Sequence, residues 1–156
     1  MGVGPSTKET TLHHVNDPMV DVARRDKEID LLGVAVVGSP QDNEEKFYVA
    51  KRLGMLAEAL GVDGVIIYAE GFGNQHVDFA AHIEELGKRG IPVVGLTFAG
   101  NGLVVENEYM EDIIDLDKAK EGMETEIVCQ NTVEEKDMIK ALKILKEKMK
   151  RRGGKK

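Results

Sequence analysis

The sequence predicts an α/β protein: a three-layer sandwich with a mostly parallel sheet of four to five strands, of the Rossmann or flavodoxin-like type. Short apolar runs alternate along the chain with segments of helical periodicity, which is the pattern of βαβ units. The runs are apolar at consecutive positions, as in strands buried on both faces of a parallel sheet. A chain of 156 residues is long enough for one such core.

The elements follow in a regular order. Residues 31–37 form an apolar run that predicts the first strand, and residues 43–60 repeat apolar side chains at helical spacing. Residues 65–68 predict a second strand, and residues 74–86 the helix after it. The later expected elements are a strand within 91–98, a helical turn within 103–110, and strands at 113–116 and 126–128. The last element is a helix that begins with a capping box from Thr132 to Glu135. Its buried stripe consists of Met138, Leu142, Leu145 and Met149.

Charge and composition divide the chain into an irregular N-terminal arm (1–28), a single α/β domain (29–150) and a basic tail (151–156). The net charge is −7, although residues 140–156 hold nine basic residues and one acidic residue. Because phosphate recognition needs a basic surface, the acidic body argues against nucleic-acid binding. The basic end is either a solvated helix terminus or a docking site for an acidic partner or RNA.

Several other classes of protein are excluded. No apolar run approaches the ~20 residues of a membrane span, and the N-terminal sequence lacks the basic and apolar regions of a signal peptide. A single cysteine, Cys129, excludes an internal disulfide framework and fits a reducing, cytoplasmic location. The four histidines include no i, i+4 pair, so no metal site is expected.

A ligand site is expected beyond the carboxyl ends of the parallel strands. The loops 38–43, 69–74 and 99–102 lie there and are rich in Gly, Asn and Ser. The second of these runs from Gly71 through Phe72 and Gly73 to Asn74, and has only part of a dinucleotide fingerprint, so no nucleotide is expected. It is either a seat for a small anion or a glycine turn with an Asn74 cap.

His76 lies in the first turn of the helix that follows this loop. A histidine at this position can bind a substrate carboxylate or transfer a proton. The alternative interpretation is a surface residue near the helix cap.

Several motifs together resemble the D-proline reductase family. They are GPSTKET (4–10), VGSPQ (37–41), EKFYVAKRLGML (45–56), EGFGN (70–74), HVDFA (76–80) and RGIPVVG (89–95). The resemblance is to the pyruvoyl-bearing, C-terminal (β-chain) part of the proprotein and covers residues 3–148. A more distant similarity is to component B of the glycine, sarcosine and betaine reductases.

The resemblance implies an oxidoreductase subunit of anaerobic amino-acid fermentation, the Stickland reaction. In that family the proprotein is cleaved before a cysteine, which becomes a pyruvoyl group that engages a small amine-bearing acid. A selenocysteine-containing partner subunit then cleaves the C–N bond reductively, and D-proline becomes 5-aminovalerate. The implied partners are the N-terminal part of the same proprotein and that selenoprotein, without metal, nucleotide, nucleic acid or membrane.

Site roles follow from the same resemblance. The pyruvoyl-forming cysteine corresponds to Gly2, which has no sulfur, so the chain is expected to be inactive alone. His76 is the second expected catalytic position. The loop at 99–106 looks shortened, which leaves the substrate open. The expected substrate-binding residues are Ser39, Gln41, Asn43, Glu70, Gly71, Phe72, Gly73, Asn74 and Asp78.

Two alternatives to a D-proline reductase component remain from the sequence. One is a non-catalytic binding or assembly paralogue. The other is a related glycine/sarcosine/betaine-type reductase subunit that acts on another amine substrate.

Overall fold

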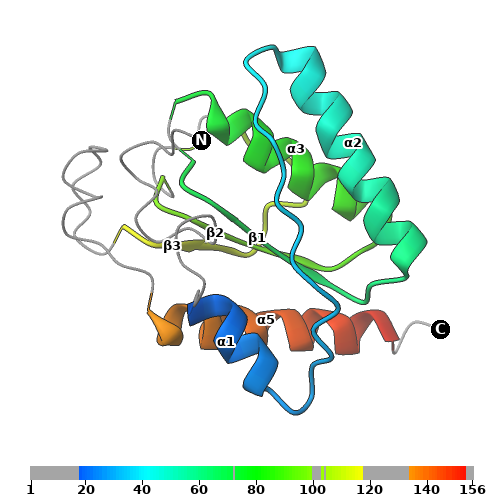
Figure 1. Cartoon of the computed structure of the whole chain (residues 1–156), viewed down its shortest axis with the longest axis vertical. Helices are drawn as coiled ribbons and strands as arrows, with labels where there is room; N and C mark the ends of the chain where they lie inside the picture. Colours follow the sequence, from blue (N-terminus) through cyan, green and yellow to red (C-terminus); the bar gives the residue numbers. More distant parts are fainter. Residues whose placement is uncertain (1–17, 72, 100–102, 104, 118–133, 154–156) are drawn as a thin grey trace.

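The computed structural model describes residues 18–71, 73–99, 103, 105–117 and 134–153 (Figure 1). Three parallel strands form a sheet in the order β1-β2-β3, and helices lie on both of its faces. The elements are α1 (Pro18–Arg25), α2 (Asn43–Leu60), β1 (Val65–Ala69), α3 (Gln75–Lys88), β2 (Val93–Thr97), β3 (Ile113–Asp115) and α5 (Glu135–Gly153). The predicted α/β class is therefore confirmed, with three strands in the described part of the chain.

The middle strand, β2, is the most enclosed part of the sheet. Every residue of β2 is buried, whereas every residue of β1 is only half-buried. Val65 of β1 lies opposite Val93, and Gly95 lies opposite Ile113 of β3. A Cβ at Gly95 would lie 2.5 Å from the Phe79 ring, so only glycine lets α3 approach the sheet this closely.

Two apolar clusters hold the layers together. On one face of the sheet, Phe79, Ile83 and Leu86 of α3 pack with residues of β1 and β2. On the other face, the buried residues of α5 pack against β2 together with α1. The predicted buried stripe of α5 is confirmed: Met138, Leu142 and Leu145 are buried, and the partly buried Met149 packs against the same cluster.

Capping explains the sharp limits of α2, which match the predicted 43–60. The Asp42 carboxylate accepts hydrogen bonds from the backbone N–H groups of Glu44 and Glu45. At the other end, Gly61 adopts a left-handed conformation (φ +66°), which favours glycine.

The predicted strand over residues 31–37 is wrong in this conformation. The segment has no sheet partner, and the side chains of Leu32, Val34 and Val36 are 63%, 55% and 63% exposed. It instead leads from the α1/α5 layer to the start of α2 in the other layer (Figure 1). An apolar run has the composition of a strand, but a strand forms only where a neighbour satisfies its backbone groups.

Other segments also differ from expectation. Residues 18–25, assigned to the irregular arm, form α1, whose first residue is Pro18, a residue suited to the first turn of a helix. Within 103–110, where a helical turn is expected, the described residues form a single turn closed by the hydrogen bond from the Met110 N–H to the Asn107 carbonyl (3.1 Å). The expected strand at 126–128, Thr132, Cys129 and residues 154–156 lie outside the described residues.

Candidate functional site

The carboxyl ends of β1 and β2 are joined by a compact set of contacts. The Thr97 hydroxyl donates a hydrogen bond to the Glu70 carbonyl (2.9 Å) and accepts one from the Ala99 N–H (3.2 Å). Gly71 is buried with a φ of +84°, and a Cβ there would lie 2.2 Å from the Thr97 hydroxyl oxygen. The glycine of this loop is therefore required both by its backbone conformation and by the neighbouring strand.

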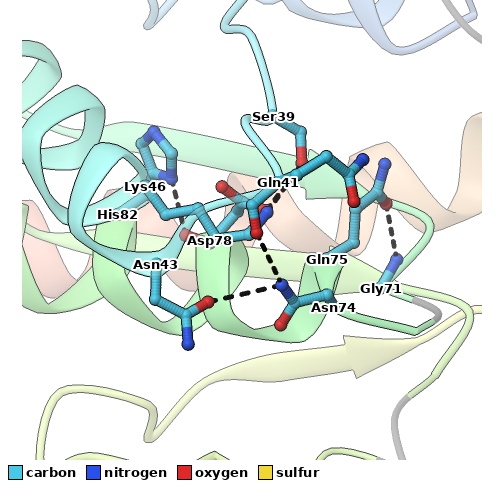
Figure 2. Close-up of polar contacts among 9 residues, drawn as sticks. All are labelled: Ser39, Gln41, Asn43, Lys46, Gly71, Asn74, Gln75, Asp78 and His82. Atoms are coloured by element: carbon cyan, nitrogen blue, oxygen red, sulfur yellow. Dashed lines mark hydrogen bonds and ion pairs between the residues drawn. The ribbon is translucent and has the colours of Figure 1, made fainter.

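A buried polar cluster lies next to this loop, between α2, α3 and the segment before α2 (Figure 2). The Lys46 ammonium forms an ion pair with the Asp78 carboxylate, and their side chains are only 2% and 10% exposed. The Ser39 hydroxyl donates to the same carboxylate oxygen (2.7 Å) and accepts from the ammonium (3.1 Å). These three groups fasten the loop before α2 to the first turn of α3.

His82 extends the cluster by one helical turn. Its Nδ1 lies 2.6 Å from the Asp78 carbonyl oxygen, which can only accept, so Nδ1 carries the proton. Within the described residues, His82 Nε2 and Asp78 Oδ1 are buried without a hydrogen-bond partner. Because the Ser39 hydroxyl is already shared by Lys46 and Asp78, the geometry favours a positioning role over a nucleophilic one for this serine.

A second set of amides, exposed at Asn43 and Asn74 and half-buried at Gln75, lies beside the buried cluster (Figure 2). Asn74 precedes α3, but its side chain makes no capping bond to the helix. Its amide instead donates to the Asn43 side-chain oxygen (3.3 Å) and to the Gln41 carbonyl (3.4 Å). The Gln75 side chain accepts from the Gly71 N–H (3.2 Å). Exposed amides of this kind can hydrogen-bond both a carboxylate and an amine.

The structure thus brings together several of the predicted residues. Ser39 contacts Asp78, and Asn74 contacts Asn43 and the backbone of Gln41, although the two segments are more than 30 residues apart. Of the remaining predicted residues, Glu70 and Gly71 lie in the loop after β1. Gly73 and the half-buried His76 lie near the start of α3. Phe72 and Gly2 lie outside the described residues.

Sequence reasoning missed Lys46 and His82. Lys46 had a usable signal: it shares the buried face of α2 with Ala50, Gly54 and Ala57 at helical spacing. A lysine on a buried face needs an anionic partner, because an isolated buried charge is very unfavourable. His82 offered no comparable signal.

Two further observations concern the described part of the chain. No group of three or more His, Cys, Asp and Glu side chains is arranged there to hold a metal ion. None of its helices combines the length and the apolar character needed to cross a membrane.

Residues 2–150 match the family of glycine/sarcosine/betaine reductase component B subunits. The chain belongs to this family. It is 49% identical to the D-proline reductase proprotein of Acetoanaerobium sticklandii, over 92% of this chain and 23% of that protein. No solved structure matches it.

Members of the family that are named for other substrates are less similar. The alpha subunit of the sarcosine reductase component B of Peptoclostridium acidaminophilum is 33% identical over 61% of this chain and 23% of that protein. The corresponding betaine reductase subunit is 29% identical over 83% of this chain and 28% of that protein. The chain spans about a quarter of the length of these relatives.

Proposed function

We propose that this chain is a component of a D-proline-reductase-like enzyme, which opens the ring of D-proline to 5-aminovalerate in the cytoplasm of an amino-acid-fermenting anaerobe. The observation that carries the proposal is the 49% identity to the D-proline reductase proprotein over 92% of this chain. The relatives named for sarcosine and betaine reach only 33% and 29%. This difference in identity favours D-proline over sarcosine and betaine as the substrate.

The chain's part in the reaction is to bind and orient the substrate. The exposed amides of Asn43 and Asn74 supply hydrogen-bond donors and acceptors for the substrate's carboxylate and amine. The buried ion pair between Lys46 and Asp78 keeps the N-terminal ends of α2 and α3, where these amides lie, in a fixed relation. His76, half-buried at the start of α3, is the proposed proton carrier.

In the reductase family that the chain resembles, the ketone of a pyruvoyl group would supply the electrophile that engages the amine, and a selenol of a partner subunit would supply the reducing nucleophile. Gly2 stands where the resemblance places the pyruvoyl-forming cysteine, and it has neither a thiol nor a group to eliminate. The residues of this chain therefore do not fit the formation of that group at position 2. The same observation supports a second candidate function, a non-catalytic assembly subunit that retains the fold.

Intact mass spectrometry of the natively produced protein, before and after phenylhydrazine treatment, tests for a ketone. A hydrazone on this chain or on a polypeptide that copurifies with it would support the reductase component. Absence of any adduct in a complex that contains the chain would favour the assembly subunit.

Turnover tests the substrate. The complex is expected to convert D-proline to 5-aminovalerate with a dithiol reductant, and to leave glycine, sarcosine and betaine unreacted. Turnover of one of these three compounds in place of D-proline would contradict the substrate assignment while leaving the reductase role in place.

A further inference from the structure

We propose that residues 31–37 are a strap that closes onto the outer edge of β1 as a fourth parallel strand. In the structure the strap is open, and the apolar side chains of Leu32, Val34, Val36 and Val37 are exposed. β1 is half-buried along its whole length because no strand within the described residues flanks its outer edge. The inference is independent of the proposed reductase function.

Both ends of the strap are already fixed beside the matching ends of β1. Before the strap, Asp26 and Glu28 pair with Lys146 of α5 (2.8 and 2.7 Å). Gly64, just before β1, lies against Leu145 of the same helical turn. The strap therefore begins at the level where β1 begins.

The other end of the strap lies beside the end of β1. Ser39 hydrogen-bonds Asp78 in the first turn of α3, the helix that follows β1 through a short loop. The strap thus already runs in the direction of β1, as a parallel strand must. Its seven residues extend to ~23 Å, more than the ~16 Å of the five residues of β1.

An apolar face of α2 that is half-buried at Val49 and Leu53 and exposed at Leu56 and Leu60 is directed toward the position of the closed strap. Val49, Leu53, Leu56 and Leu60 share one face of the helix at spacings of four, three and four residues; we call this face the seam. Leu56 and Leu60 are 49% and 56% exposed. The seam is turned by about a quarter turn from the stripe of α2 that packs on α3. Since α2 runs antiparallel to the strands, this rotation directs the seam toward the sheet, beyond β1.

The alternation of side chains in the strap fits this position. Leu31 packs against the α1/α5 cluster, so in a strand the odd-numbered residues would face that layer and the even-numbered ones would face α2. Leu32, Val34 and Val36 would then cover the seam, while Gly33 and Ala35 would lie on the opposite face. The same division exists in β1, where Ile66 and Tyr68 face α1/α5 and Val65 and Ile67 face α3.

Closure also bears on the candidate site. The strap continues directly into Gly38 and Ser39, and through them into the loop that carries Gln41 and leads to Asn43 at the start of α2. When the strap pairs with β1, the position of this loop is set by the sheet as well as by the contact between Ser39 and Asp78.

Crosslinking of paired cysteines tests the proposal in the full chain, with Cys129→Ser as background. Val34→Cys with Leu53→Cys places thiols on the strap and the seam. The matched control, Ala35→Cys with Leu53→Cys, moves the first thiol to the other face of the strap. A short dithiol-reactive crosslinker is expected to join the first pair within one chain about tenfold faster than the control. Equal rates would overturn the proposal, and so would a product that joins two chains, which would assign the seam to a second copy.

Hydrogen exchange on the unmodified protein gives an independent measurement. In the closed strap every second amide N–H is bonded to β1, so exchange at alternate residues of 31–37 is expected to be at least about tenfold slower than the intrinsic rate. Exchange at the intrinsic rate would show that the strap stays open and would overturn the proposal.

Discussion

Replacing Lys46 by methionine tests whether the ion pair inside the candidate site is as enclosed as its geometry indicates. Methionine keeps the apolar stem and removes the ammonium, which leaves the Asp78 carboxylate with the Ser39 hydroxyl as its remaining donor among the described residues. Both side chains are nearly inaccessible, at 2% and 10% exposure. Breaking one partner of such a pair typically costs about 3–5 kcal/mol of unfolding free energy. That is a large share of the ~5–15 kcal/mol that keeps a typical domain folded.

Urea denaturation followed by circular dichroism measures this loss. The double variant Lys46→Met/Asp78→Leu removes both charges and is expected to recover at least about half of it, because no unpaired carboxylate remains. Lys88→Met is the surface control: Lys88 pairs with Glu84 on the exposed side of α3, at 49% and 37% exposure, and should cost less than about 1 kcal/mol. A cost for Lys46→Met as small as that of the control would refute the view that the pair is buried.

Three further perturbations follow from the structure. Gly71→Ala should lower the unfolding free energy by about 1–3 kcal/mol because of its positive φ and the close Thr97 hydroxyl, whereas Gly38→Ala, with no atom near its Cβ position, should not; equal effects in the same urea assay would contradict this. Gly95→Ala forces a methyl group against Phe79 and Ile113 and should cost about 1–3 kcal/mol, against little change for Gly153→Ala on the surface. Hydrogen bonds from the Lys146 ammonium lower the pKa of Asp26 and Glu28 below their ordinary values of 3.8 and 4.5 and raise the pKa of Lys146, so these pairs stabilise the fold above the ordinary acid values and below pH 10.5. Their contribution is lost as the pH falls through the lowered pKa values of the two carboxyl groups or rises through the raised pKa of Lys146. Lys146→Met should therefore weaken the dependence of the urea midpoint on pH at both the acid and the alkaline end. A urea midpoint that falls with acid pH just as in the unmodified protein would show that the pairs do not contribute.

The spacing of apolar residues predicted those helices and strands that are stabilised by capping residues at their own ends and by burial of their own apolar side chains. The apolar spacing up to Gly61 predicted α2, and the capping of its two ends shows why its limits agree. The run at 31–37 has equally strong strand composition, but pairing depends on a neighbour that composition does not describe. α1 was not predicted, because eight residues are too few to show a helical periodicity and because this helix is stabilised by its packing on α5.

The candidate site was predictable to a similar extent. The rule for parallel sheets placed Ser39, Asn43, Asn74 and Asp78 at one end of the strands, and the structure joins them in pairs. The pairing of Lys46 with Asp78 was not predicted, because an ion pair between two helices depends on how closely the helices approach each other. That approach is set by Ala50, Gly54 and Ala57 on α2.

The layer made of α1 and α5 has a consequence for how the protein is made. Arg25 meets Glu135 at a separation of 110 residues, and Lys146 meets Asp26 at a separation of 120 residues. At ribosomal speeds of about 5–20 residues per second, α1 waits on the order of 5–20 seconds before its partner helix emerges. During that interval the side chains of Met19, Val22 and Ala23 lack the α5 side chains that bury them in the folded protein. The nascent chain therefore passes through a stage in which α2, α3 and the sheet can assemble on one side while the other side of the sheet is bare, and this is the stage at which it most needs protection from aggregation.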